Sequence, residues 1–520
     1  MVAAVVSSGS NTASGEFSPM SGASLWFAGS LLALSNFVVV LDMTITNVSV
    51  PNIAGSLAVS SSQGTWVITS YAVAEAIMVP LSSWLSRRLG AVRLFVGAMI
   101  GFGICSALCG LAPSLGFLVV FRVLQGICGG PMMPLSQTLL RRIFPPAQQN
   151  AALGLWAMTT VVAPIAGPLL GGALVDGVGW PWIFFINVPV AMVVAVLAWR
   201  TLAKHETAIE KQPVDFVGLG LLITWVAAMQ IMLDNGKDLD WFDSPYIVAL
   251  ATVAAVGFIA FLIWELTDAH PVVDLKVFRH RGFAVAALVM SLAFGAFFST
   301  VVLVPLWLQT NLGYTATWAG RATAFTGVLA VIMSPIVARL TTTRDSRLLV
   351  SFGVLVFGVS TFWRSSFTTD SDFAQIIWPQ LLQGFAMPFF FIPLMQVALS
   401  AVNLRETTSA AGLLTFMRST AAAFATSITT TSWENIASAH HADIAGSLNG
   451  GQSTLDTLMR AGATAGQALR QLEGMVQTQA VMVATDHVFL VTSCVFVLAA
   501  GAIWIAPKGK RGPASASAAH

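Results

Sequence analysis

Charged residues are scarce in this chain of 520 residues, since Asp, Glu, Lys and Arg together make up only 9% of it. A soluble globular domain carries charge on about a quarter of its residues. The mean hydropathy is +0.79 and 56% of the residues are hydrophobic, which excludes an ordinary soluble domain and indicates that a lipid bilayer is the main solvent. The net charge of +2 is small and dispersed; without a clustered basic face, the sequence excludes a nucleic acid partner.

Cysteine is also rare. The four cysteines, Cys105, Cys109, Cys128 and Cys494, all fall in apolar stretches, so no loop offers a disulfide framework or a zinc site. The sequence contains no nucleotide-binding fingerprint, catalytic triad or metal-ligand cluster. It therefore predicts neither an enzyme nor a bound cofactor or metal.

The first 24 residues contain no Lys or Arg, whereas a cleavable signal peptide begins with a basic segment. We expect residues 1–24 to form a flexible tail ahead of an uncleaved first membrane span.

About fourteen apolar stretches fill the rest of the chain, each long enough to cross the roughly 30 Å hydrocarbon core of a bilayer. No alternating, barrel-like pattern competes, so all are predicted to be helices. They lie near 25–50, 65–83, 94–112, 116–140, 150–173, 182–200, 216–233, 246–266, 283–309, 319–338, 348–363, 373–400, 408–432 and 485–506.

The loops between these stretches are unequally basic. With the N-terminus inside, 18 of the 25 Lys and Arg residues fall on the cytoplasmic side, and cytoplasmic loops are the ones that carry such an excess. Both termini are therefore predicted to be cytoplasmic. The opposite side holds Lys237, Arg364, Arg460 and Arg470.

A weak internal repeat divides the chain. Leu124-Gln125-Gly126 in the fourth span recurs as Leu382-Gln383-Gly384 in the twelfth, and parallel repeats are built into many transporter folds. We predict two six-helix bundles over 25–200 and 283–506, with an inserted helical hairpin and its links over 201–282. The second bundle includes an external segment over 433–484, part of which has the pattern of an amphipathic helix, and a basic cytoplasmic tail follows over 507–520.

Three ionisable residues, Asp42, Glu75 and Arg122, lie inside predicted spans of the first bundle. Such groups are costly in a bilayer and usually mark an ion or proton pathway. Asp42 and Arg122 fall at similar depth, so they can meet, and we predict that all three residues serve proton coupling. The alternatives are a fixed ion pair that locks two helices, and a Glu75 carboxyl that only hydrogen-bonds between helices.

Five motifs in order resemble the major facilitator superfamily, specifically its fourteen-span drug:proton antiporters of the EmrB type. They are LDMTITNVSVP at 41–51, QGTWV at 63–67, RVLQG at 122–126, APIAGPLLGG at 163–172, and PVVDL at 271–275 with FR at 278–279. The loop after the second span departs from the superfamily pattern, because Arg87 stands where an acid is expected. That departure weakens the case for the charge contact that the resemblance implies there.

The motif in the fifth span, with Pro164, Gly167, Pro168, Gly171 and Gly172, is implied by the resemblance to mark exporters. These residue types also allow the fifth span to pivot against a neighbouring helix, since Pro removes a helix hydrogen bond and Gly allows close helix packing. An ordinary close helix crossing needs the same residues. In EmrB-like exporters the resemblance further implies a periplasmic adaptor protein and an outer-membrane channel of the TolC type as partners.

Large, soft side chains inside the spans are candidates to bind varied hydrophobic substrates, although packing or lipid-facing residues look the same in a sequence. Arg418 in the thirteenth span is a further intramembrane charge, with a functional or a structural role. The substrate-binding candidates are Gln125, Trp156, Met158, Phe294, Phe297, Phe298, Met387 and Phe390.

These patterns together predict a proton-driven antiporter of the bacterial inner membrane that exports hydrophobic or amphiphilic compounds by alternating access. A proton-coupled nutrient importer of the same fold is the first alternative. A membrane sensor or scaffold that has lost transport is the second, and it would tolerate neutralisation of Asp42 and Arg122.

Overall fold

The computed structural model describes residues 20–507, apart from 21, 60, 65, 147, 210–214, 269–270, 404–405, 448–451 and 462. Most of each predicted terminal tail therefore lies outside the described residues. In the described part the chain is helical and no strand is present. The longer helices are α1 (Gly22–Ser56), α3 (Trp66–Leu89), α4 (Ala91–Gly110), α5 (Leu115–Gly129), α6 (Met132–Ile143), α7 (Gln149–Gly177), α9 (Asn187–Leu202), α10 (Phe216–Asn235), α11 (Pro245–Thr267), α12 (Arg281–Thr310), α13 (Ala316–Thr343), α14 (Ser346–Arg364), α15 (Phe373–Ser400), α16 (Thr407–Ser447) and α18 (Ala465–Ala502). Short helices are α2 (Ser61–Gly64), α8 (Trp182–Phe185) and α17 (Gln452–Arg460).

Twelve segments of the described chain are long and apolar enough to cross a membrane. Two further helices, α7 with 29 residues and α16 with 41, pack among them and complete the fourteen predicted spans. The all-helical, fourteen-span prediction is thus confirmed. The fourth span differs from the expected single helix, because it is broken between α5 and α6 at Gly130 and Pro131, and proline lacks the N–H that a continuous helix needs.

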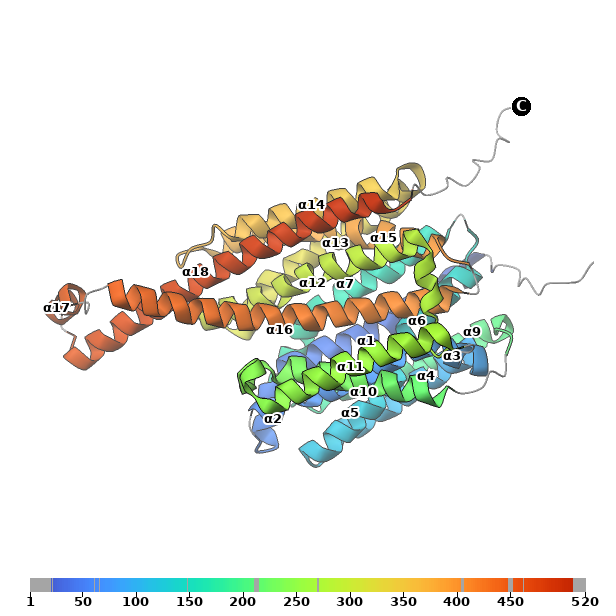
Figure 1. Ribbon diagram of the computed structural model, residues 1–520, viewed down its shortest axis with the longest axis horizontal. Coiled ribbons are helices and arrows are strands. Elements are labelled where there is room, and N and C mark those ends of the chain that lie inside the picture. The colour runs from blue at the N-terminus through green and yellow to red at the C-terminus, as the bar shows by residue number, and fades with distance from the viewer. Residues whose placement is uncertain are drawn as a thin grey trace, which may run out of the picture.

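The helices pack as two groups joined along two seams. Helices α1, α3, α4, α5, α6, α7 and α9 contact one another, as do α12 to α16 and α18. One seam is formed by α7 against α13, and the other by α3 and α6 against α16. The predicted inserted hairpin is α10 and α11, and α10 packs on α3 of the first group and on α16 of the second (Figure 1).

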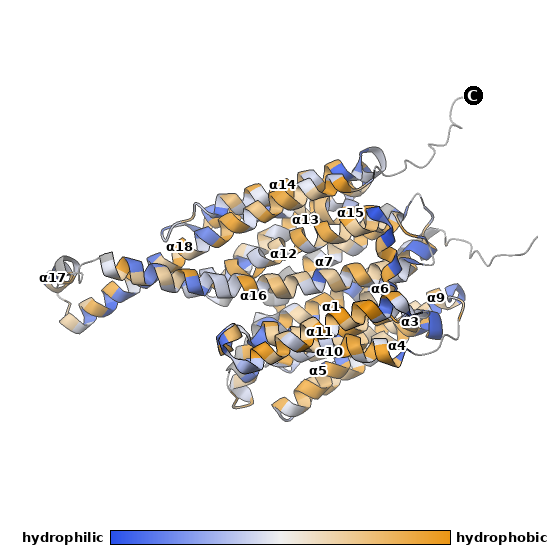
Figure 2. Ribbon diagram, viewed as in Figure 1, coloured by the Kyte–Doolittle hydropathy of each residue, from blue (hydrophilic) through white to orange (hydrophobic). Residues whose placement is uncertain are grey.

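The segment 433–484, predicted to be external with an amphipathic helical stretch, is helical over most of its length. Helix α16 continues to Ser447, α17 follows, and α18 begins at Ala465. Together these helices project beyond the rest of the bundle at one end (Figure 1). Hydrophilic residues are frequent on the projection, whereas the middle of the bundle is mostly hydrophobic (Figure 2). Trp433 on α16 donates to Thr485 Oγ1 on α18 over 2.9 Å, and this bond ties the two helices together near the base of the projection.

The internal repeat has a structural reason. Gly126 lies where α5 crosses α3, and a Cβ there would stand 2.5 Å from the carbonyl oxygen of Tyr71. Gly384, its counterpart in α15, faces the backbone of Thr326 on α13 just as closely. A side chain cannot be accommodated at either crossing without moving backbone, so glycine is required at both.

We expect Gly126→Ala and Gly384→Ala each to lower the stability of the protein by about 1–3 kcal/mol, because overpacking against backbone cannot be relieved by a rotamer change. Thermal unfolding of the purified protein in detergent measures the effect. Gly116→Ala on α5 is the matched control, since its added Cβ would meet no atom within 4 Å. Equal melting temperatures for all three variants would contradict the close-crossing argument.

Candidate functional site

Asp42 of α1 and Arg122 of α5 form a buried ion pair, with 2.6 Å between Asp42 Oδ2 and Arg122 Nη1. Both residues are 1% exposed. The other carboxylate oxygen of Asp42 accepts hydrogen bonds from Gln125 Nε2 at 3.1 Å and from Asn187 Nδ2 at 2.8 Å. Arg122 also donates to the carbonyl of Val67 at 3.0 Å and to Gln125 Oε1 at 2.9 Å. Because a buried charge is costly unless it is paired and hydrogen-bonded, loss of either charge alone would leave the other buried and unpaired.

The guanidinium of Arg122 is also covered by aromatic rings. Its central carbon lies 4.3 Å from the ring centroid of Tyr71 and 5.6 Å from that of Phe184. Asn187, at the start of α9, completes the network and was not among the sequence candidates. Its amide carries no charge, so neither hydropathy nor the search for ionisable residues singles it out.

The glycines of the predicted antiporter motif pack on α1 next to Asp42. A Cβ at Gly167 would overlap Thr44, and one at Gly171 would stand 3.4 Å from the carbonyl oxygen of Ile45, whereas Gly172 meets no atom within 4 Å. The side chains of Pro164 and Pro168 lie outside the described residues. Two of the three glycines therefore let α7 approach the helix segment that carries the ion pair.

Glu75 on α3 and Arg418 on α16 are both buried on helices that pack against each other at the seam between the two groups. Glu75 is 4% exposed and Arg418 5%, and each is the charged group with the largest electrostatic effect on the other. They are not in direct contact, since no ion pair within 4.0 Å joins them in the described chain. Arg418 instead donates to Met133 Sδ on α6 at 3.0 Å and lies 5.5 Å from the ring centroid of Phe294 on α12. One buried acid and one buried base, on helices of different groups, thus lie near the same seam.

Several predicted substrate-binding residues gather inside the second group. Phe294 lies within 6 Å, centroid to centroid, of Phe297, Phe298 and Phe391. Phe390 is fully buried and Met387 is 3% exposed. In the first group, Trp156 is 1% exposed and donates to Ser136 Oγ at 2.8 Å, while Met158 is half-buried. The structure thus places Gln125 in the ion-pair network and Trp156 and Phe390 in packed interiors, with Phe294 beside Arg418.

The second group contains a fully buried arginine that the sequence assigned to an outer loop. Arg364, the last residue of α14, donates to Gln380 Oε1 at 3.1 Å and to Gln383 Oε1. Gln383 donates in turn to Thr300 Oγ1 at 3.0 Å. Gln383 therefore repeats the role of Gln125, and Thr300 stands where the first group has Asp42. The second group has the same amide scaffold with a cation but without the carboxylate.

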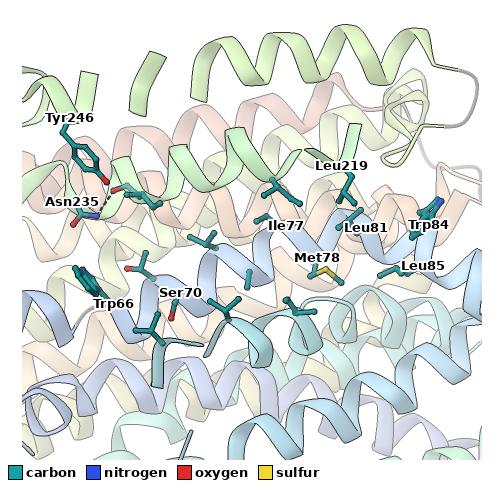
Figure 3. A pocket seen from close by; sticks show the side chains of 18 residues that line it. Trp66, Ser70, Ile77, Met78, Leu81, Trp84, Leu85, Leu219, Asn235 and Tyr246 are labelled. Atoms are coloured by element: carbon teal, nitrogen blue, oxygen red, sulfur yellow. Dashed lines mark hydrogen bonds between the residues drawn. The ribbon is translucent and has the colours of Figure 1, made fainter. Parts of the chain in front are cut away.

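An apolar groove of about 750 Å³ runs along α3, between α5 and the inserted hairpin. Trp66, Asn235 and Tyr246 lie at one end and Trp84 and Leu85 at the other (Figure 3). The groove opens on the outside of the bundle, since Val123, Ile223 and Tyr246 in its wall are each more than a third exposed. None of the predicted substrate-binding residues lines this groove.

Arg141 of α6 closes one end of the seam between the groups. Its Nη1 donates to the carbonyl of Leu399 on α15 at 2.6 Å and to Thr407 Oγ1 on α16 at 3.2 Å. The two groups are therefore joined by hydrogen bonds at the end that the loop charges predict to be cytoplasmic.

Comparison with known proteins agrees with this architecture. The family model described as Major Facilitator Superfamily matches residues 32–426. The Multidrug export protein EmrB of Escherichia coli K12 is 44% identical over 493 residues, which cover 94% of this chain and 96% of the relative. The Fatty acid resistance protein FarB of Neisseria gonorrhoeae is 42% identical over 94% of this chain and 98% of its own.

Solved structures with the same fold are more distant in sequence. The human organic anion transporter MFSD10 has a TM-score of 0.58 at 13% identity, covering 92% of this chain and 99% of its own. A bacterial homologue of the human lysosomal transporter Spinster, solved in an inward-facing and unoccupied conformation, has a TM-score of 0.52 at 17% identity and covers 94% and 100%. At these identities the likeness concerns the fold alone.

Proposed function

Because the chain belongs to the major facilitator superfamily, we propose that this transporter is a proton-driven antiporter that exports hydrophobic or amphiphilic compounds across a bacterial inner membrane. The observation that carries the proposal is the buried Asp42–Arg122 pair, since an intramembrane carboxylate is the usual carrier in proton relays. The names of the relatives, multidrug export and fatty acid resistance, support both the direction of transport and the class of substrate.

In this proposal Asp42 takes up a proton on one side and releases it on the other as the two groups rock about the seams. Protonation of Asp42 removes the charge with which Arg122 pairs, so proton binding and the contact between α1 and α5 change together. Arg122 itself keeps its proton and modulates the acid. The glycines of α7 beside Thr44 and Ile45 allow α1 and α7 to shift without side-chain obstruction.

The proposal includes cytoplasmic termini and external partners. The projecting helices α16, α17 and α18 then lie on the periplasmic side (Figure 1). There they form a docking surface for a periplasmic adaptor protein that leads to an outer-membrane channel of the TolC type. The length of α16 and α18, 41 and 38 residues, supports this, because the roughly 30 Å hydrocarbon core needs only about 20 helical residues.

The proposed activity is tested in proteoliposomes with an imposed pH gradient. We expect a hydrophobic fluorescent dye to accumulate against its own gradient, together with proton movement in the opposite direction, and an ionophore that collapses the pH gradient to stop both. Dye and proton moving in the same direction would favour the importer. An absence of any substrate movement with a range of dyes would favour the sensor or scaffold.

A further inference from the structure

A second, basic cavity lies beyond one end of the groove along α3. Trp84 and Leu85 line the groove, and Arg88 and Leu89, one turn further on the same face of α3, line a cavity of about 400 Å³ that also contains Arg93. The Arg88 guanidinium carbon lies 5.4 Å from the centroid of the Trp84 ring, so this pair lies between the two spaces. A long apolar surface thus ends at two cationic side chains.

We propose that this surface is a binding site for an anionic single-chain amphiphile taken from the bilayer, such as a long-chain carboxylate, with its head group at Arg88 and Arg93 and its chain along α3. This site rests on the proposed function, because a ligand bound there would then be exported by the transporter. The inserted hairpin, α10 and α11, forms the outer wall of the site, which opens sideways to the lipid.

The cationic side chains at one end of the groove set the direction of the ligand. At the basic end, the carboxylates of Glu206 and Asp215 already serve as helix caps: Glu206 accepts from the backbone N–H groups of Val92 and Arg93 at 2.9 Å, and Asp215 accepts from Gly218 N at 2.8 Å. Glu206 also lies 3.9 Å from Arg93 Nε. The buried indole N–H of Trp84 has no acceptor among the described residues, so it can donate to a carboxylate.

At the opposite end the groove has no cationic side chain in its described lining, and Asp234 hydrogen-bonds Thr69 in the wall. A carboxylate head is therefore favoured at Arg88, where guanidinium groups bind carboxylates well.

The shape of the groove suits an acyl chain. From Trp66 to Trp84 the wall of α3 is about 27 Å long at 1.5 Å per residue, close to the roughly 30 Å hydrocarbon core. Beyond Thr69 and Ser70, which lie near the Trp66 end, the wall consists of aliphatic side chains and Met78. Ala74 in that wall is the neighbour of Glu75, which faces the other side of α3 near the seam. A chain in the groove is thus separated from the seam between the groups by one helix.

The test measures binding without any gradient, so its failure is distinguishable from a failure of antiport. Spin-labelled stearate and a trimethylammonium analogue of equal chain length are titrated into the reconstituted protein, and electron paramagnetic resonance gives the motionally restricted fraction. We expect stearate to associate about tenfold more tightly than the cation, a difference of about 1.4 kcal/mol. Arg88→Gln should remove that preference.

Two neighbouring residues of α5 provide a matched pair of variants. Val119 lines the groove, whereas Val120 does not and is 54% exposed. Val119→Trp fills the groove and should lose the restricted stearate, whereas Val120→Trp should bind it like the wild type. Equal binding by both variants, or equal binding of stearate and the cation to the wild type, overturns the proposal. A spin-labelled phospholipid that displaces stearate from the groove would likewise overturn it in favour of a structural lipid.

Discussion

Replacing Asp42 by Asn is expected to reduce pH-gradient-driven transport to the level seen without a gradient. The carboxylate of Asp42 meets three donors, from Arg122, Gln125 and Asn187. Asn keeps the size of the side chain but can neither carry the charge nor bind and release a proton. The rate of dye accumulation in proteoliposomes, with and without an imposed gradient, measures the loss.

The effect on coupling can be separated from an effect on folding. Removing one partner of a buried pair costs about 3–5 kcal/mol, because the other charge stays buried and unpaired. The double variant Asp42→Asn with Arg122→Gln removes both charges, so we expect it to melt close to the wild type and still to lose gradient-driven transport. Asp345→Asn is the control, since Asp345 pairs with Arg347 outside the bundle core at 2.9 Å. Gradient-driven transport in the double variant would contradict a proton-carrying role for Asp42.

The number and place of the helices could be predicted because the bilayer imposes one rule on every span. An apolar stretch of about 20 residues must be a helix in lipid, so the predicted hairpin at 216–233 and 246–266 agrees with α10 and α11. The rule says nothing about where a helix ends in water. Helices α16 and α18 therefore continue past their apolar stretches into a segment that hydropathy alone describes as a loop.

The ion pair was predictable from charge, whereas the partners that hold it were not. Asp42 and Arg122 stand out because charges are rare in the spans, but Asn187 becomes part of the network only through the packing of α9 against α1. Arg364 shows the converse error. It lies at the end of an apolar stretch, where a sequence suggests a loop, yet the folded chain buries it between Gln380 and Gln383. Nor could the groove be predicted, since it exists only because the inserted hairpin docks beside α3 and α5.

Replacing Glu75 by Gln is expected to lower gradient-driven transport by at least about tenfold, equivalent to about 1.4 kcal/mol of coupling free energy, while substrate exchange without a gradient continues. Glu75 on α3 and Arg418 on α16 belong to different helix groups, and their attraction acts across a seam that must open during alternating access. Protonation of Glu75 removes that attraction, so proton uptake and seam opening are linked. Gln is permanently neutral and breaks the link without a change of shape.

A matched carboxylate makes this prediction specific. Glu265 on α11 is also buried, at 1% exposure, but it accepts from the backbone N–H of Val273 at 3.1 Å, away from the seam. Glu265→Gln should therefore transport like the wild type, and Arg418→Gln should share the defect of Glu75→Gln. Because both members of the pair act through one interaction, the double variant should be no worse than either single one. Additive losses would mean that Glu75 and Arg418 act separately, and full coupling in Glu75→Gln would leave Asp42 as the carrier on which the cycle depends.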